Sequence, residues 1–195
     1  MKFALATANM GKIVEMQNIL SKLKLEALTR DELGIAIDIE ETGTTFYENA
    51  LIKANAICTI TGLPAIADDS GLCVKALDDA PGVYSSEYGG ITLTDTERCE
   101  YLLKNMKNME HREAKFVCNI VCVFPNGDVL TAKGECRGEI LKALHGVNGF
   151  GYDPVFRPNG YEKSMAELTL EEKNTISHRG KALNDFSQLL MNYEK

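Results

Sequence analysis

Pro64-Ala65-Ile66-Ala67-Asp68-Asp69-Ser70-Gly71 is the stretch that decides how the rest of the chain is interpreted. Residues 65–67 form a short apolar run typical of a buried strand, and residues 72–76 are expected to continue as strand. Between the two runs, Asp-Asp-Ser-Gly predicts an acidic turn. A buried strand that ends in two carboxylates costs desolvation free energy unless a cation or hydrogen-bond donors meet them. We therefore expect a functional site here; the alternative is an Asx turn that only satisfies backbone donors.

Helix-like and strand-like segments alternate on both sides of this stretch. Apolar periodicity predicts helices over residues 11–23, 168–173 and 177–193. Capping boxes predict two more helices, which begin after Thr45 and Thr94 and run to about residues 61 and 106. Strands are expected over residues 2–6, 26–29, 114–124 and 129–136, with a weaker one over 35–40. An Asn-Gly pair at 126–127 adds a hairpin signal. These signals predict an α/β (α+β mixed) chain with a mixed sheet, in a single domain spanning 1–195.

The composition is that of a soluble globular protein, with 45% hydrophobic and 25% charged residues. No stretch approaches the ~20 apolar residues that span a bilayer, and the apolar run at residues 3–6 is too short for a secretory signal. We therefore expect a cytoplasmic protein. The formal net charge of −7 argues against a protein that coats nucleic acid. It leaves room for local binding of a small polyanion.

Six cysteines lie mostly inside apolar or periodic segments, and no two have the spacing of a CxxC motif. We interpret them as small buried side chains with free thiols and expect no structural zinc site. They are Cys58, Cys73, Cys99, Cys118, Cys122 and Cys136.

A small polar turn, Thr7-Ala8-Asn9-Met10-Gly11-Lys12, joins the first strand to the first helix. Such a junction presents backbone N–H groups and the positive end of a helix dipole to an anion. It is not a Walker A loop, because Ala6 and Ile13 stand where that pattern needs glycine and serine or threonine. The turn therefore predicts a phosphate-binding loop, and an ordinary turn with a solvated lysine is the alternative.

The segment Glu40-Glu41-Thr42-Gly43 places two more carboxylates ahead of the helix that begins after Thr45. Adjacent acids are usually a solvated run. Hard oxygen ligands are also what Mg²⁺ prefers, since it binds one or two carboxylates together with waters and substrate phosphates. These acids and those at Asp68 and Asp69 are therefore candidate magnesium ligands.

Two later segments carry residues suited to a flat, polar ligand. Gly149-Phe150-Gly151-Tyr152-Asp153-Pro154 permits a tight loop that offers a ring face. Lys173 and the stretch Ser177-His178-Arg179-Gly180-Lys181 supply donors able to meet a carbonyl edge or a phosphate. Cations at a helix start oppose the helix dipole, so they need a reason other than stability. The alternatives are a loop corner with core aromatics and an unremarkable basic helix start.

Taken in this order, the five segments resemble the inosine/xanthosine triphosphate pyrophosphatase family. The resemblance covers nearly the whole chain, from residue 5 to residue 180. Each motif is weak alone, but the acidic stretch at 64–71, Glu40-Glu41-Thr42-Gly43, the loop at 149–154 and Ser177-His178-Arg179-Gly180 are specific as a series. Members of this family remove non-standard purine nucleoside triphosphates such as ITP, dITP and XTP.

The resemblance implies an elongated, two-lobed fold with a curved mixed sheet flanked by helices, a nucleotide cleft between the lobes, a homodimer and dependence on Mg²⁺. By position, the triphosphate would be held by Thr7, Ala8, Asn9, Met10, Gly11 and Lys12. Many relatives carry glycine where this chain has Ala8. Glu41 and Asp69, with Glu40 as a further candidate, would ligate Mg²⁺, and Asp68 would lie beside them. Asp69 would also be the candidate proton acceptor. Further substrate contacts would come from Ser70, Phe150, Gly151, Tyr152, Asp153, Lys173, His178 and Arg179.

The resulting hypothesis is hydrolysis between the α- and β-phosphates, with release of a monophosphate and pyrophosphate. The cleavage site comes from the resemblance. Selectivity would lie at position 6 of the purine, where inosine and xanthosine present a carbonyl to Arg179 or His178. One alternative is a nucleotide-binding regulatory module without chemistry. Another is a related pyrophosphatase for modified pyrimidines. A phosphotransferase is disfavoured because no Walker A or kinase-type set occurs.

Overall fold

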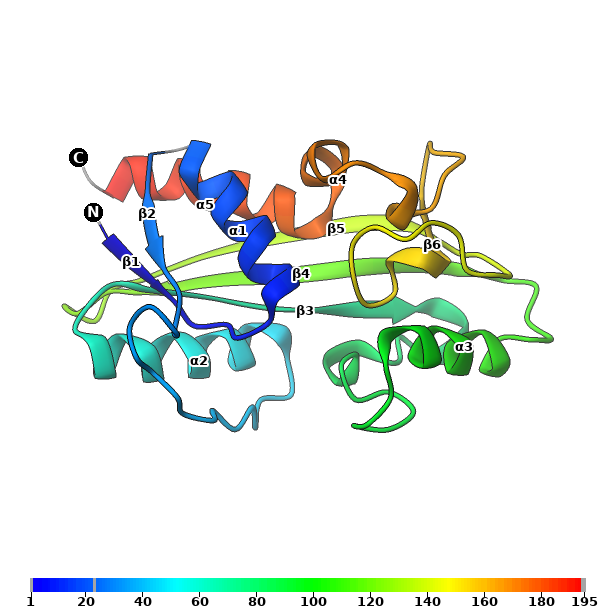
Figure 1. The fold of residues 1–195 in the computed structure, drawn as a ribbon, viewed down its shortest axis with the longest axis horizontal. Helices are drawn as coiled ribbons and strands as arrows, with labels where there is room; N and C mark the ends of the chain where they lie inside the picture. Colours follow the sequence, from blue (N-terminus) through cyan, green and yellow to red (C-terminus); the bar gives the residue numbers. More distant parts are fainter. Residues whose placement is uncertain (1, 23, 194–195) are drawn as a thin grey trace. The chain divides into compact units, whose positions relative to one another are not determined.

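The computed structural model describes residues 2–22 and 24–193, which form a six-stranded mixed sheet with helices packed on it (Figure 1). The strand order is β2-β1-β3-β4-β5-β6. Strand β1 pairs in parallel with β2 and β3, whereas β5 and β6 are antiparallel. The strands are β1 Lys2–Leu5, β2 Glu26–Leu28, β3 Ala65–Val74, β4 Glu113–Val123, β5 Val129–Ile140 and β6 Phe156–Pro158. The α-helices are α1 Met10–Lys22, α2 Phe46–Thr61, α3 Asp95–Asn105, α4 Leu170–Ile176 and α5 His178–Tyr193. The predicted mixed α/β class is confirmed.

The chain divides into two compact units, each assembled from separate segments. Unit 1 contains the described residues up to 69, residues 118–134 and the described residues from 178. Unit 2 contains residues 70–117 and 135–177. Strands β3, β4 and β5 each contribute residues to both units.

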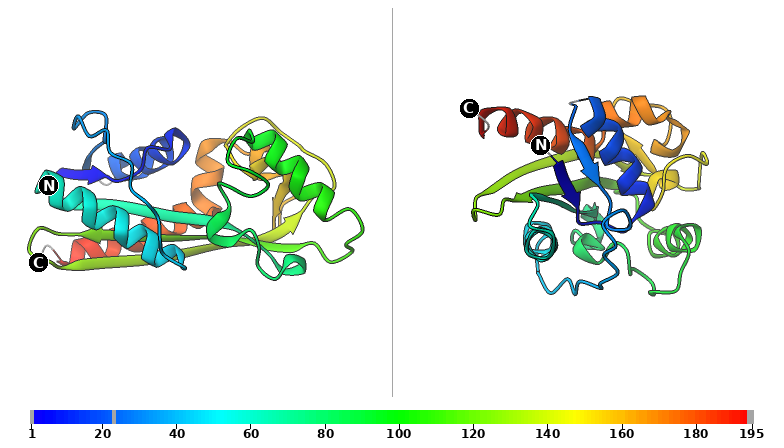
Figure 2. Two further views of the ribbon diagram at one scale, coloured as in Figure 1. Left: turned by 90° about the horizontal axis from the view of Figure 1, so that it is seen from below. Right: turned by 60° about the vertical axis from the view of Figure 1, so that its left-hand side comes forward.

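In unit 1 the sheet is covered on both faces. Alternate residues of β1 and β3 belong to different cores: Ile66 packs with α1 and α5, whereas Ala65 and Ala67 pack with α2. Figure 1 and the right-hand view of Figure 2 place α1 and α5 on one face and α2 on the other. Because side chains alternate along a strand, a sheet buried on both faces has a continuous apolar run. This burial accounts for the apolar run ahead of Asp68.

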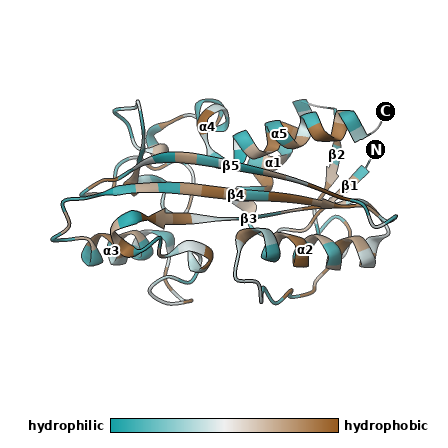
Figure 3. Ribbon diagram, turned by 180° about the vertical axis from the view of Figure 1, so that it is seen from behind, coloured by the Kyte–Doolittle hydropathy of each residue, from teal (hydrophilic) through white to brown (hydrophobic). Residues whose placement is uncertain are grey.

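Unit 2 has its own apolar core. It contains Leu72 and Val74 from β3, Leu102 from α3, and Tyr152 and Val155 from the loop that precedes β6. Figure 3 shows hydrophobic stretches along β3 and β4 and alternating hydrophobic and hydrophilic bands on the helices. Such banding is the pattern of helices with one buried face.

The helix starts and ends follow the local signals. Thr45 caps α2 and Thr94 caps α3, each in a complete capping box, as predicted. Gly62 ends α2 in the left-handed conformation, with φ 66°. A third capping box, Thr169 with Glu172, begins α4. The helices expected near residues 11–23, 168–173 and 177–193 are also present.

Two local predictions are wrong. Residues 68–71 do not form a turn, because β3 runs unbroken from Ala65 to Val74 between β1 and β4. Pairing within a sheet has overridden the turn preference of Asp-Asp-Ser-Gly. Residues 35–40 do not form a strand; apart from Ile35 the segment is mostly exposed. Because the segment is exposed, its alternating apolar side chains bury little surface, and the alternation does not stabilise a strand.

All six cysteines are buried and carry free thiols, as expected. Burial raises the pKa of Cys99 and of Cys118 to about 12, so both stay protonated at neutral pH. Among the described residues, no helix combines the length and apolar character needed to cross a membrane.

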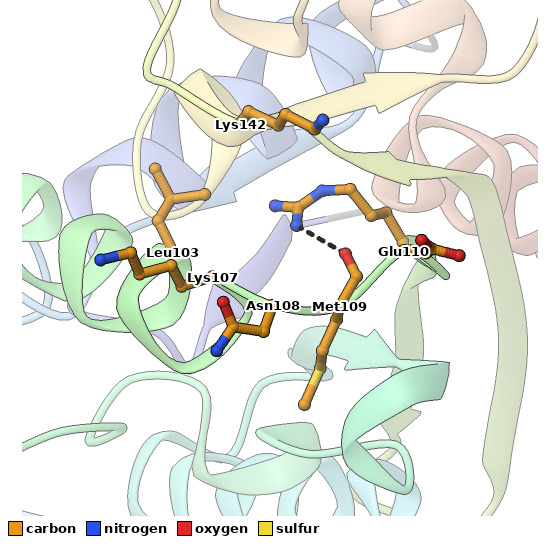
Figure 4. A pocket seen from close by; sticks show the side chains of 7 residues that line it. Leu103, Lys107, Asn108, Met109, Glu110 and Lys142 are labelled. Carbon is orange, nitrogen blue, oxygen red and sulfur yellow. Dashed lines mark hydrogen bonds between the residues drawn. The ribbon is translucent and has the colours of Figure 1, made fainter.

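Two surface hollows of unit 2 are lined by other residues than those predicted for the site. One, of about 490 Å³, is lined by Leu103, Lys107, Asn108, Met109, Glu110, Arg112 and Lys142 (Figure 4). The guanidinium of Arg112 donates to the carbonyls of Met106, Ile140 and Leu141 and so fastens the end of α3 to the end of β5. Another hollow, of about 620 Å³, is lined by residues of β3, β4 and β5 with mixed charge. Neither contains a residue predicted for the site.

Candidate active site

The loop between β1 and α1 has the geometry expected of an anion-binding turn. The Thr7 hydroxyl accepts a hydrogen bond from the Asn9 amide at 3.1 Å, and the Asn9 side chain accepts one from the Lys12 amide at 3.0 Å. These bonds fix the start of α1. The amides of Met10 and Gly11 belong to the first turn, where N–H groups have no acceptor inside the helix. The loop therefore offers backbone donors and a lysine at one helix end.

Lys12 reaches back from this loop to Asp68, with its Nζ 3.1 Å from Oδ2. Asp68 is fully buried on β3. Its Oδ2 also accepts hydrogen bonds from Nη2 and Nε of Arg179, at 3.0 and 3.2 Å. Burial alone would raise the pKa of Asp68, but the cations Lys12, Arg179 and Lys53 outweigh it and hold the pKa well below its usual range. Asp68 is thus a permanent anion inside unit 1.

Arg179 lies at the start of α5 and is 1% exposed. Besides its bonds to Asp68, its Nη1 pairs with Glu15, a buried residue of α1. The structure therefore places this guanidinium between two buried carboxylates. Breaking one side of such a pair typically costs about 3–5 kcal/mol, because it leaves an uncompensated buried charge. The predicted contact of Arg179 with a purine stays a prediction.

A second ion cluster surrounds Lys53 of α2. Its Nζ lies 2.7 Å from Oε2 of Glu41 and 3.3 Å from Oδ1 of Asp69. Burial raises the pKa of Asp69 and, although Lys53 and Lys12 oppose this, the net shift is upward. Neighbouring carboxylates of β3 therefore differ: Asp68 is held ionised, and Asp69 is the more basic. Such a difference is the usual sign of two carboxylates with different chemical roles.

Asn49 joins the two acidic segments. Its Nδ2 donates to Oδ2 of Asp69 at 3.4 Å, and its Oδ1 accepts the amide of Gly43 at 2.8 Å. A side chain at residue 43 would collide with Asn49 and with Glu48, whose Cβ would lie 2.6 Å away. Glycine at this position is therefore required for the loop that carries Glu41 to reach Asn49.

Sequence reasoning missed Lys53, Asn49 and Glu15. A signal was present: Lys53 and Asn49 interrupt the buried stripe of α2, which otherwise consists of Ala50, Ala54, Ile57 and Cys58. Glu15 interrupts the buried stripe of α1 in the same way. A polar or charged residue inside an apolar helical stripe loses its hydration and needs a partner. Asp69 is the partner of Asn49 and Lys53. Glu15 pairs with Arg179, which in turn bonds to Asp68.

The acidic cluster fits a magnesium ion of the kind that binds with substrate. The oxygens of Glu41 and Asp69 already meet on one cation, the ammonium of Lys53. Within residues 2–22 and 24–193, no group of three or more His, Cys, Asp or Glu side chains is arranged to hold a metal. Two carboxylates suit Mg²⁺, which completes its shell with waters and phosphates rather than an all-protein cage. Glu40 is exposed and forms no ion pair or hydrogen bond with the part of the chain that is described.

Unit 2 carries a separate set of predicted residues. Lys173 is buried with its Nζ 2.5 Å from Oδ2 of Asp153 and 4.8 Å from the centre of the Phe150 ring. The same oxygen of Asp153 accepts the Phe150 amide at 2.9 Å. Gly149 has a positive φ, and a Cβ there would collide with this carboxylate. The glycine therefore lets Asp153 fold back and hold Phe150 beside Lys173.

The remainder of this loop is anchored to unit 2. The Gly151 amide donates to Asp95 at the start of α3, at 2.7 Å. Tyr152 is 4% exposed, and its hydroxyl donates to the carbonyl of Ser85 at 2.8 Å. Tyr152 is therefore a core residue and does not offer its ring to a ligand, contrary to the prediction for either aromatic of the loop. Phe150, which is half-buried, is the better candidate.

The remaining predicted residues fall into three environments. Ala8, Asn9 and Met10 are exposed on the phosphate loop. Ser70 is half-buried on β3, the residue after Asp69. His178 is buried beside Arg179 at the start of α5. The structure thus brings together the phosphate loop, both aspartates, Glu41 and Arg179 within unit 1, and Phe150, Asp153 and Lys173 within unit 2.

Comparison with known proteins identifies the family of the chain. The sequence model of the Ham1 family matches residues 3–189. A dITP/XTP pyrophosphatase of Aquifex aeolicus is 48% identical, and the alignment covers 100% of this chain and 99% of the relative. One from Deinococcus radiodurans is 46% identical over 93% of this chain and 89% of the relative.

Solved structures give the same result. The Ham1 protein of Staphylococcus aureus superposes with a TM-score of 0.89 at 39% identity, over 100% of both chains. A HAM1 protein from Coxiella burnetii gives a TM-score of 0.89 at 43% identity, over 98% of this chain and 99% of the other. By its residues, its fold and these relatives, the chain belongs to the Ham1 family.

Proposed function

We propose that this protein hydrolyses non-standard purine nucleoside triphosphates such as ITP, dITP and XTP to the monophosphate and pyrophosphate. The observation that carries the proposal is the pair Asp68 and Asp69 on β3, each carboxylate meeting a lysine in unit 1. Relatives with 46–48% identity bear the name dITP/XTP pyrophosphatase.

The cations of unit 1 are suited to a triphosphate. Lys12 sits at the start of α1 beside the first-turn amides of Met10 and Gly11. Phosphate oxygens would accept hydrogen bonds from these groups, and the helix dipole would favour their charge. Negative charge grows on the pyrophosphate as it leaves, so fixed donors here would stabilise the transition state more than the substrate.

Glu41 and Asp69 are the residues that would hold Mg²⁺, because their oxygens already share a cation. When bound, the ion would neutralise phosphate oxygens and lower the pKa of a bound water. Glu40 is a weaker candidate, since Lys53 contacts Glu41 and does not contact Glu40.

Asp69 is the proposed proton acceptor. In the metal-free site, burial raises the pKa of Asp69 while Asp68 is held ionised, so Asp69 is the better base of the two; Asn49 and Lys53 contact its two oxygens there. Water would attack the α-phosphorus, its proton would pass to Asp69, and the bond from the α-phosphorus to the bridging oxygen would break. The electron pair would leave with pyrophosphate. The α–β cleavage site is supported by the name of the relatives.

The residues of unit 2 are suited to the base. Phe150 offers a ring, and Lys173 and Asp153 offer a donor and an acceptor beside it. A site that donates to a 6-carbonyl would leave its donor unpaired against the amino group of adenine, at about 1–3 kcal/mol. Guanine shares the carbonyl, so its exclusion must depend on its 2-amino group.

A substrate panel tests the function. Purified protein is incubated with ITP, XTP, GTP and ATP, with Mg²⁺ or with EDTA, and pyrophosphate and orthophosphate are measured separately. We expect pyrophosphate from ITP and XTP with Mg²⁺ alone. Tight nucleotide binding without product would support a regulatory module instead, and turnover of modified pyrimidines in preference would support the related pyrophosphatase.

We also propose that the protein is a homodimer, as the family resemblance implies, and that it is cytoplasmic, as the sequence composition led us to expect. Light scattering would then give twice the chain mass of 21.5 kDa. A mass of one chain at micromolar concentration would contradict the dimer.

A further inference from the structure

Gly134 of β5 lies directly under the backbone of α5 at the helix start. A Cβ at residue 134 would lie 2.7 Å from the amide nitrogen of Ala182. It would lie nearer still to the carbonyl oxygen of His178. Real Cβ atoms essentially never come within 3.0 Å of such a heavy atom. Both obstacles are backbone atoms, so no side chain can turn aside to make room. The helix itself would have to move.

The backbone conformation does not explain this glycine. Gly134 has no positive φ, so any residue could adopt its conformation. On this face of β5 the side chains become smaller towards the start of α5, with Leu130, Ala132 and Gly134 in succession. Space, rather than chain flexibility, is what the glycine provides.

What this space positions is the start of α5. His178 and Arg179 are its first two residues, and Arg179 carries hydrogen bonds of 3.0 and 3.2 Å to Asp68 and an ion pair to Glu15. N–H···O hydrogen bonds in proteins usually span about 2.7–3.2 Å, so these bonds already lie near the long end of that range. An α5 start displaced by 1 Å would therefore separate the guanidinium from the buried carboxylate of β3.

We propose that Gly134 is a positioning residue: by letting α5 rest on the backbone of β5, it sets where Arg179 meets Asp68. Gly134 touches no proposed substrate atom and acts through the helix. The effect on turnover rests on the proposed function, whereas the effect on Arg179 does not.

The chain contains a matched control. Gly138 occupies the same face of β5, four residues further along, and its Cβ would collide with the carbonyl oxygen of Arg157 and with the Phe156 ring. That collision displaces β6, within unit 2. Gly138→Ala thus introduces a similar clash against β6, and Gly134→Ala introduces one against α5.

Arginine side-chain NMR provides the readout. The chain has six arginines, so the ¹⁵Nε–H spectrum is simple, and Arg179→Lys identifies the Arg179 signal by its loss. Hydrogen exchange of that group is then measured in the wild type, Gly134→Ala and Gly138→Ala. We expect exchange at least about 10-fold faster in Gly134→Ala alone, because a buried, bonded group exchanges only on opening. Glu15→Gln weakens the ion pair of Arg179 without a backbone clash. It therefore provides the reference exchange rate for a loosened Arg179.

Turnover is measured in parallel. A 1 Å misplacement can cost about 100-fold in rate, so kcat/KM for ITP should fall at least 10-fold in Gly134→Ala and less than 3-fold in Gly138→Ala. An Arg179 signal unchanged in Gly134→Ala would overturn the proposal. Failure of Gly134→Ala to fold would also overturn the proposal, whether or not Gly138→Ala folds. Gly134 would then be a requirement of the fold. Absence of any NTP hydrolysis by the wild type would instead contradict the proposed function and leave the NMR result to decide the role of Gly134.

Discussion

The ammonium of Lys53 lies 3.3 Å from the carboxylate of Asp69 and 2.7 Å from the carboxylate of Glu41. One buried cation thus bridges the two acids proposed to hold Mg²⁺. Its single positive charge offsets only part of their negative charge. Binding of a metal at these oxygens must displace Lys53, and a lysine so displaced is free to meet a phosphate.

Asp69→Asn tests the central residue. The amide keeps the size of the side chain but cannot accept a proton, so we expect kcat to fall at least about 10³-fold, within the range of general-base contributions. Circular dichroism and Tm should change little. Near-normal turnover with Mg²⁺ would show that Asp69 is neither base nor necessary ligand.

Lys53→Met removes the cation that competes for the metal site. Coulomb attraction between charges about 3–4 Å apart is worth several kcal/mol at an effective dielectric constant of 20. We therefore expect Mg²⁺, titrated calorimetrically without nucleotide at pH 8, to bind at least about 10-fold more tightly than to the wild type. Lys115→Met, which removes a lysine paired with Glu135 in unit 2, is the control and should change nothing. Weaker Mg²⁺ binding by Lys53→Met would contradict the shared-cation arrangement.

Glu41→Gln and Glu40→Gln distinguish two adjacent acids. Both are exposed, but Glu41 contacts Lys53 at 2.7 Å and Glu40 does not. Loss of a metal ligand should raise the Mg²⁺ concentration for half-maximal activity by about 10-fold or more, following the usual effects at metal sites. We expect this for Glu41→Gln and a change below 3-fold for Glu40→Gln. The reverse order would make Glu40 the ligand.

Much of this arrangement could be predicted from sequence because its signals are local. The capping boxes at Thr45 and Thr94 concern residues three apart, and the helices begin where they indicate. The phosphate loop is equally local, since Thr7, Asn9 and Lys12 bond to one another.

What could not be predicted depends on partners distant in sequence. The neighbours of Asp68 favour a turn, yet β3 continues through Asp68 as an unbroken strand of the sheet. Arg179 was interpreted as a donor to substrate, and Glu15, 164 residues away, was not considered. A buried charge reveals that it has a partner but not which one.

The stability of the protein should depend on Asp68 in acid. Its pKa is lower in the folded state than the ordinary 3.8. A group of this kind stabilises the fold fully above its unfolded pKa, and the contribution is lost as pH falls through that value towards the folded pKa. The free energy of unfolding in urea should therefore fall between pH 5 and pH 3, and less so in Asp68→Asn. Asp31→Asn, at an exposed loop position, should follow the wild type. Equal slopes for all three proteins would contradict the role of Asp68.

Phe150→Ala tests whether unit 2 contacts the base. Stacking of a base on an aromatic ring is worth about 1–3 kcal/mol, so KM for ITP should rise about 5- to 150-fold. The Asp153–Lys173 pair does not depend on the ring, because Asp153 accepts the backbone amide of residue 150. The fold should therefore survive, and inhibition by free pyrophosphate, which has no base, should be unchanged. Phe150→Tyr keeps a ring and should restore KM to within about 3-fold. If KM for ITP rises and inhibition by pyrophosphate weakens equally, the substitution has damaged the site in general. An unchanged KM for ITP would show that Phe150 does not contact the base.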